Sequence, residues 1–89
     1  YDTTVTAEAP QLHPSVRLVG VPLTQIAREV GKLTVKNVVA LGALQGAARL
    51  FPDDTILSAV RGALGPKKAA LLPMNEEAYR RGVAAAIAR

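Results

Sequence analysis

The stretch from Thr34 to Phe51, TVKNVVALGALQGAARLF, constrains the fold of this chain more than any other part of the sequence. It can form one long helix, and its few strongly polar side chains lie mostly in the end turns. A helix that is apolar on nearly every side belongs in a protein interior, because a surface helix carries a polar face. We therefore expect a central, buried helix over residues 34–50, with the other elements packed around it.

Two glycines in the middle of this helix indicate how it packs. Gly42 and Gly46 are four residues apart, so they share one face and leave a flat surface that another backbone can approach closely. Each glycine costs about 1 kcal/mol of helix propensity relative to alanine, and close packing is the structural reason to keep both. The same spacing occurs in transmembrane dimers, but Asn37, Gln45 and Arg49 interrupt the apolar run, so we predict no membrane span.

Composition limits the classes of protein to consider. A chain of 89 residues is one small domain whose stability is marginal unless a partner adds to it. The absence of cysteine excludes disulfides, zinc thiolate sites and cysteine-bound iron–sulfur clusters on this chain. The net charge of +4 comes from dispersed basic residues, and aromatic residues are only 3%, so no nucleic-acid partner is expected. The first residues lack the pattern of a signal peptide, which favours a cytoplasmic protein.

The N-terminal part of the chain predicts an α/β arrangement. Residues 1–6 are rich in β-branched residues, and the nearly continuous apolar run of residues 15–21, SVRLVGV, is typical of a strand buried in a parallel sheet. Pro22 ends this strand, and Leu23, Ile26, Ala27 and Val30 then recur at helical spacing. We therefore expect strands near residues 1–6 and 15–21, followed by a helix over residues 23–30 that Gly31 ends.

Two further helices complete the prediction, over residues 54–64 and 74–88. Asp53 or Asp54 is expected to cap the first of them, and Gly65-Pro66 to end it. The expected core positions are Ile56, Leu57, Val60 and Leu64 in the first helix, and Met74, Ala78, Val83 and Ile87 in the second. Two strands are marginal as a sheet on their own. We therefore interpret residues 1–89 as a single partial α/β domain of about two strands and four helices, its sheet completed by missing residues or by another chain.

The sequence predicts no catalytic residue and no metal ligand. His13 is the only histidine, which leaves no second imidazole for a metal site or a catalytic triad. No glycine-rich phosphate-binding motif is present, and the adjacent acidic pairs at residues 53–54 and 76–77 suit helix starts. Asn37 and Asn75 remain as candidate contacts to a ligand or a partner subunit. Their alternative roles are a local hydrogen bond for Asn37 and helix capping for Asn75.

Several short motifs occur in a recognisable order along nearly the whole chain. They are V-G-V-P, L-T-Q-I-A-R-E-V-G, K-N-V-V-A-L-G-A-L and M-N-E-E-A-Y-R-R-G, and the most diagnostic residues are Ile26, Ala27, Asn37, Leu41, Gly42, Asn75, Ala78 and Gly82. In this order they resemble the C-terminal half of the gamma subunit, or gamma domain, of pyruvate-type 2-oxoacid:ferredoxin oxidoreductases. The resemblance implies a cytoplasmic complex that oxidatively decarboxylates a 2-oxoacid with coenzyme A to acyl-CoA and carbon dioxide, and passes the electrons to ferredoxin.

The resemblance also implies where the cofactors lie. Thiamine diphosphate, Mg²⁺, coenzyme A and [4Fe-4S] clusters are expected on other subunits of alpha, beta and delta type, and none on this chain. Gamma domains of the family begin with a G-G-x-G-Q-G strand, turn and helix, which is missing here, so a fragment or a split gamma domain is expected. The alternative hypothesis is a stand-alone helical module that binds an acidic protein partner through Lys67, Lys68, Arg80 and Arg81.

Overall fold

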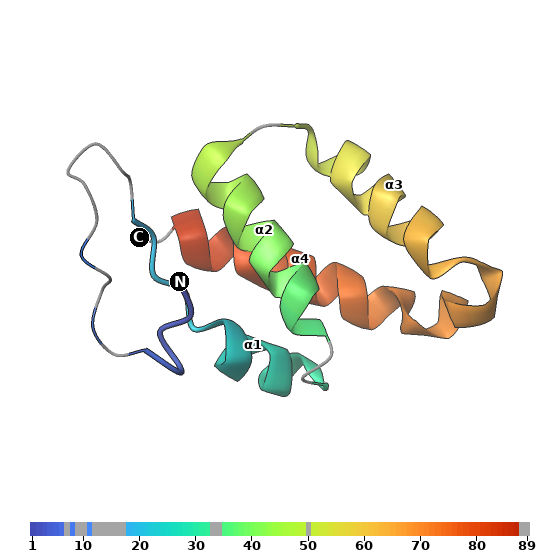
Figure 1. Cartoon of the computed structure of the whole chain (residues 1–89). Coiled ribbons are helices and arrows are strands. Elements are labelled where there is room, and N and C mark those ends of the chain that lie inside the picture. The colour runs from blue at the N-terminus through green and yellow to red at the C-terminus, as the bar shows by residue number, and fades with distance from the viewer. Residues whose placement is uncertain (7, 9–10, 12–17, 33–34, 50, 88–89) are drawn as a thin grey trace.

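The computed structural model describes residues 1–6, 8, 11, 18–32, 35–49 and 51–87; His13, residues 15–17 of the expected strand, Thr34 and the side chain of Lys67 lie outside this description. Its helices are α1 (Leu23–Val30), α2 (Lys36–Ala48), α3 (Asp53–Leu64) and α4 (Leu72–Ile87), with the short 3-10 helix η2 (Pro66–Leu71) before α4 (Figure 1). The four expected helices are therefore present. None of the described helices is long and apolar enough to cross a membrane.

The N-terminal segment pairs with the residues before α1 in parallel orientation. The N–H of Val21 donates to the carbonyl of Tyr1, and the N–H of Thr3 donates to the carbonyl of Val21, both at 3.0 Å. The backbone nitrogen of Tyr1 also donates to the carbonyl of Val19 at 3.0 Å. Within the residues that the structure describes, Asp2 and Val21 are the one pair joined as a parallel bridge. The orientation is that of a parallel sheet, but the pairing extends over one bridge only.

The prediction of two strands, near residues 1–6 and 15–21, is wrong for the described residues, which form no strand. The pairing stops because the chain turns away at both segments. The N–H groups of Val5 and Thr6 bond back to the carbonyl of Asp2, at 3.3 and 3.1 Å. On the other segment, Pro22 leads directly into α1. A pair of strands without further neighbours gains too little to extend against these turns.

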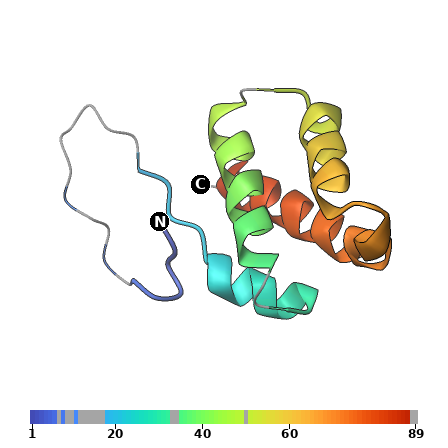
Figure 2. The same cartoon turned by 45° about the vertical axis from the view of Figure 1, so that its right-hand side comes forward.

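Helices α2 and α4 cross at very short range, and this crossing is the centre of the fold (Figures 1 and 2). A Cβ atom added at Gly42 would lie 2.1 Å from the carbonyl oxygen of Tyr79, and one added at Gly82 would lie 2.1 Å from that of Val39. At Gly46 the corresponding distance to the carbonyl oxygen of Val83 is 2.6 Å. The predicted packing role of Gly42 and Gly46 is confirmed, and Gly82 supplies the matching flat surface on α4.

Only one face of α2 is buried, so the expectation of a helix covered on all sides is wrong for this chain alone. Val39, Gly42 and Gln45 face the interior, whereas 54% of Leu44 is exposed. The main helical neighbours of α2 are α4 and α1. They cover its inner face and leave its outer face, which carries Leu44, open. The sequence of α2 thus carries more apolar surface than the rest of the described chain can cover.

Helix α1 closes the other side of the core. Its apolar residues Ile26 and Ala27 pack with residues of the N-terminal segment, α2 and α4; the buried cluster comprises Val21, Ile26, Ala27, Val35, Val39, Ala78 and Ala86. Gly31 ends α1 with a positive φ of 152° and donates its N–H to the carbonyl of Ala27 at 3.1 Å. The spacing of apolar residues thus places α1 with its inner face on the α2–α4 pair.

Helix α3 is held more loosely than the others. Of its expected core positions only Val60 is buried, while Ile56, Leu57 and Leu64 are partly exposed. Gly65, at φ 68°, ends it as expected. The prediction that Ile87 of α4 belongs to the core is wrong, because this residue is 56% exposed. The buried residues of α4 are Asn75, Ala78, Tyr79, Gly82 and Ala86.

Candidate functional site

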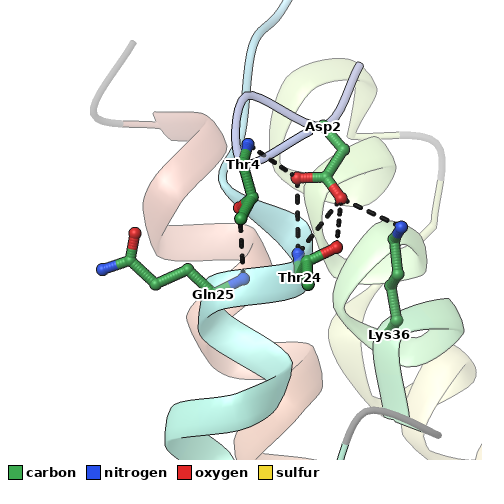
Figure 3. A network of polar contacts seen from close by, with 5 residues as sticks. All are labelled: Asp2, Thr4, Thr24, Gln25 and Lys36. Atoms are coloured by element: carbon green, nitrogen blue, oxygen red, sulfur yellow. Dashed lines mark hydrogen bonds and ion pairs between the residues drawn. The ribbon is translucent and has the colours of Figure 1, made fainter. Parts of the chain in front are cut away.

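The carboxylate of Asp2 joins three segments of the chain (Figure 3). It accepts hydrogen bonds from the N–H of Thr24 (3.2 and 3.3 Å to its two oxygens) and from the Thr24 hydroxyl. It also accepts the N–H of Thr4 at 3.0 Å, and the ammonium of Lys36 lies 2.9 Å from one of its oxygens. The hydroxyl of Thr4 in turn accepts the N–H of Gln25 at 3.1 Å. Asp2 therefore ties the N-terminal segment to the first residues of both α1 and α2.

This network replaces the cap that α1 lacks. The residue at the cap position is Pro22, which has no side-chain acceptor, and no side-chain cap bond is made from it. Two free N–H groups in the first turn, those of Thr24 and Gln25, are accepted instead by Asp2 and Thr4. A negative charge at a helix N-terminus also interacts favourably with the helix dipole. The cluster accordingly has a structural function that accounts for all its polar groups.

The hydrogen bonds determine the charge of Asp2. Partial burial raises the pKa of Asp2, but the hydrogen bonds from Thr24, Lys36 and the N–H of Thr4 outweigh it. The pKa of this carboxyl consequently lies well below its ordinary value, and Asp2 is ionised at neutral pH. A carboxylate that is held in its charged form by these donors is a poor general base.

A second polar cluster fastens α3 to the α2–α4 pair. The side chain of Gln45 is buried, and its amide bonds to the main chain of Phe51 in both directions, through its NH₂ to the carbonyl and through its oxygen to the N–H. The hydroxyl of Tyr79 donates to Asp53 at 2.6 Å, and Arg49 lies 3.6 Å from the same carboxylate. Asp53 thus lies in the first turn of α3 but bonds to Tyr79 on α4. The prediction that Asp53 or Asp54 caps α3 is wrong, because Pro52 occupies the cap position and no side-chain cap bond is made.

Burial and this bond shift both pKa values. Burial, together with the hydrogen bond to Asp53, raises the pKa of Tyr79 to about 12. The hydrogen bond from Tyr79 is the main cause that lowers the pKa of Asp53, with Arg49 and Gln45 contributing. The cluster is therefore a neutral phenol on a charged carboxylate at neutral pH, an arrangement that stabilises the α3–α4 contact.

The two asparagines singled out from the sequence lie in different surroundings. Asn37 is in the first turn of α2 with an exposed side chain. Asn75 is 7% exposed, and its NH₂ group donates to the carbonyl of Leu71 at 2.9 Å. Since α4 begins at Leu72, Asn75 is inside the first turn and does not cap the helix. It lines a pocket of about 250 Å³, and Asn37 is not among the residues lining it.

An apolar groove of about 300 Å³ runs along the outer face of α2. Its walls come from the N-terminal pairing and from α2, and the lining residues are Tyr1, Val19, Val21, Leu23, Ala40, Ala43, Leu44 and Ala47. Leu44 and Tyr1 are 54% and 37% exposed, and Leu18, which precedes Val19 in the chain, is 39% exposed. This surface combines the uncovered side of the most apolar helix with the uncompleted pairing of the N-terminal segment.

The basic residues proposed to meet an acidic partner are partly paired within the chain. Arg80 lies 3.5 Å from Glu76, and Arg81 pairs with Glu29 across the α1–α4 contact. Lys68 makes no ion pair with the described residues. The arginines therefore present less net positive charge to a partner than their adjacency in the sequence indicates.

The described part of the chain offers no donor set for the metals and clusters that the sequence resemblance implies. Without cysteine it cannot supply thiolates to an iron–sulfur cluster. Among the residues that the structure describes, no group of three or more His, Cys, Asp or Glu side chains lies close enough to hold a metal ion. These groups do not fit the described residues, and no chemical step on this chain is assigned to them.

Sequence reasoning missed the residues that carry the two polar clusters. Asp2, Thr24 and Lys36 are far apart in the sequence, and no local pattern joins them. Tyr79 was detectable in part, because it follows Ala78 on the buried side of α4 and recurs with Gly82 and Ala86 at helical spacing.

Among the described residues the chain forms a helical fold with two polar clusters that hold its helices together and an apolar groove on α2. A family model for pyruvate ferredoxin/flavodoxin oxidoreductase matches residues 1–85. The chain therefore belongs to this family, and it is part of a 2-oxoacid:ferredoxin oxidoreductase. Enzymes of this family use thiamine diphosphate and iron–sulfur clusters. No curated protein and no solved structure matches the chain significantly.

Proposed function

We propose that the chain is a gamma-type, non-catalytic part of its oxidoreductase, and that it joins the rest of the enzyme through the groove on α2 and the edge beside it. In this proposal residues 1–89 are the C-terminal half of a gamma-type α/β domain. Other parts of the enzyme, of alpha, beta and delta type, hold thiamine diphosphate, Mg²⁺, coenzyme A and the [4Fe-4S] clusters. The chain's contribution to oxidative decarboxylation is to support those parts.

The observation that carries this proposal is the unfinished parallel pairing beside an uncovered apolar surface. In a parallel ladder alternate residues point their N–H and C=O to opposite edges. Val19 and Val21 point theirs toward Tyr1 and Thr3, so those of Gly20 point to the other edge. Among the described residues neither group of Gly20 has a hydrogen-bond partner. A further strand on that edge would satisfy both groups.

The apolar groove supports the same position for the missing structure. Parallel sheets occur with both faces covered, and the surfaces left open here are the outer side of α2 and the edge at Gly20. Exposed apolar side chains that are grouped rather than scattered mark interaction sites. Leu44 and Tyr1 line one groove, and the ring of Tyr1 lies against Gly20.

Purification of the tagged chain under native conditions tests the proposal. The expected result is that other polypeptides, thiamine diphosphate and iron co-purify with it. The variant Leu44→Glu, which places a charge in the groove, is expected to lose them, because a buried unpaired carboxylate is costly. The matched control Ala59→Glu adds the same charge on the exposed side of α3 and is expected to retain them.

A different result would contradict the proposal. If the chain purifies without other polypeptides and melts alone in one sharp transition, it is a self-sufficient module. Circular dichroism of Leu44→Glu and Ala59→Glu must show equal helix content, so that loss of assembly is separated from loss of the fold.

A further inference from the structure

Most basic side chains of the described chain are engaged in ion pairs. Those that pair with a carboxylate are Lys36, Arg49, Arg61, Arg80 and Arg81. Among the other described basic side chains, Arg28, Lys32 and Lys68 make no ion pair with described residues. Lys32 and Lys68 line the same pocket, although they are far apart in the sequence. Two exposed lysines without a carboxylate partner among the described residues thus line one pocket, whereas the third cation, Arg28, lies on α1 outside it.

The pocket has a buried polar floor and apolar walls. It lies where the α1–α2 connection, the end of α3, η2 and the start of α4 meet, and its lining residues are Lys32, Val35, Leu64, Lys68, Leu71, Met74 and Asn75. Asn75 is more than nine-tenths buried, and one N–H of its amide is used by the carbonyl of Leu71. The amide has a second N–H that can donate to a ligand oxygen. No carboxylate is among the lining residues.

The local backbone brings Lys68 to this position. Lys68 departs from helical geometry inside η2, at φ −114° and ψ 19°, so that η2 bends there before α4 begins. On the opposite side of the pocket, the positive φ of Gly31 lets the chain turn sharply between α1 and Lys32. This turn lies close to α4, since a Cβ atom at Gly31 would lie 3.6 Å from the side chain of Met74. The two lysines therefore come from two bends that flank the start of α4.

We propose that this pocket binds a small aliphatic carboxylate. The ammonium groups of Lys32 and Lys68 hold the carboxylate, the second N–H of Asn75 orients a polar atom, and Leu64, Leu71 and Met74 contact the aliphatic body. The volume of about 250 Å³ is below the usual range of pockets for drug-sized ligands, which fits a short-chain acid. The site is built from this chain alone, so it does not depend on the proposed gamma-type role.

Binding of 3-methylbutanoate to the full chain, in whatever assembly it purifies, tests the proposal by isothermal titration calorimetry. The expected result is saturable binding that Lys68→Gln and Lys32→Gln each weaken at least fivefold. Arg28→Gln removes one unpaired cation outside the pocket and is expected to change the Kd less than twofold. Neutral 3-methylbutanamide is expected to bind at least tenfold more weakly, because it lacks the charge.

Three outcomes would overturn the proposal. The first is equal loss of binding in Arg28→Gln, which indicates general attraction by positive charge. The second is tighter binding of inorganic phosphate than of 3-methylbutanoate, because the apolar walls of the pocket would then contribute nothing to affinity. The third is absence of binding together with a carbodiimide cross-link between Lys68 and an acidic residue of another polypeptide. A protein carboxylate then occupies the pocket.

Discussion

Gly82, like Gly42, is a residue at which this fold leaves no room for a side chain. A Cβ atom there would lie 2.1 Å from the carbonyl oxygen of Val39 and 2.9 Å from the nitrogen of Ala43, both backbone atoms of α2. Backbone atoms cannot rotate out of the way as the end of a side chain can, so the helices themselves would have to separate. The two helices can approach this closely only because glycine stands on both sides of the crossing.

Gly82→Ala is therefore expected to lower the free energy of unfolding by about 3 kcal/mol, the upper part of the range for overpacked cores. Gly62→Ala is the matched control, since no atom lies within 4 Å of a Cβ at that position. In the interior of α3 it is expected to raise stability by about 0.5–1 kcal/mol through helix propensity. Urea unfolding measures both. Equal effects of the two variants would contradict the close crossing.

Tyr79 gives a stability effect that depends on alkaline pH. Because the pKa of Tyr79 in the folded chain is about 12 and its ordinary value is 10.0, its contribution is complete below pH 10 and is lost as the pH rises toward 12. Tyr79→Phe is expected to cost about 1–2 kcal/mol at neutral pH, where the hydrogen bond to Asp53 is lost. The difference from the wild type should shrink above pH 10. Urea unfolding over this pH range checks it, and a constant difference would contradict the assignment.

The helices and the glycines that end α1 and α3 were predictable from the sequence, whereas the groups that satisfy the N-terminus of α1 were not. The spacing of Leu23, Ile26, Ala27 and Val30 is a local signal, and the structure has a helix there. Its N-terminus is satisfied by Asp2 and Thr4, which lie about twenty positions earlier. Capping between distant segments leaves no trace at the helix start itself, where the sequence offers only Pro22.

Asp2→Asn tests this distant cap. The pKa of Asp2 is lowered in the folded chain, so its contribution to stability is present above the ordinary value of 3.8 and is lost as the pH falls below it. At neutral pH the variant is expected to unfold about 1–3 kcal/mol more easily, since charge-assisted bonds are lost. Below about pH 4 the gap should narrow. Asp54→Asn, an exposed carboxylate in the first turn of α3, is the control and should change stability by less than about 0.5 kcal/mol.

At the scale of the whole molecule, the sequence predicted more sheet than the described chain forms. The apolar run before Pro22 is typical of a strand with neighbours, but the chain supplies only the short parallel pairing with the N-terminal segment. Periodicity reports the surroundings for which a segment was selected, and under the proposed function those include structure outside this chain. The same reasoning explains why the sequence of α2 predicts a buried helix, whereas its outer side is exposed in the structure.

The absence of cysteine from the sequence allows a direct measurement of this surface. A single thiol in Leu44→Cys is expected to react with a maleimide in the isolated chain and at least tenfold more slowly in the assembled enzyme. Ala59→Cys, on the exposed side of α3, should react at similar rates in both. Equal reactivity of Leu44→Cys in the two samples would show that nothing covers the groove.

The dependence of α1 on Asp2 also sets an order of events during folding. An eight-residue helix is too short to persist alone in water, and Pro22 gives this one no side-chain cap at its N-terminus. It can become stable only after the loop that links Asp2 to Thr24 has closed, a non-local step that is slower than the local coiling of a helix. The glycine crossing of α2 and α4 does not involve Asp2, so we expect α1 to be ordered only in chains in which Asp2 has already reached Thr24.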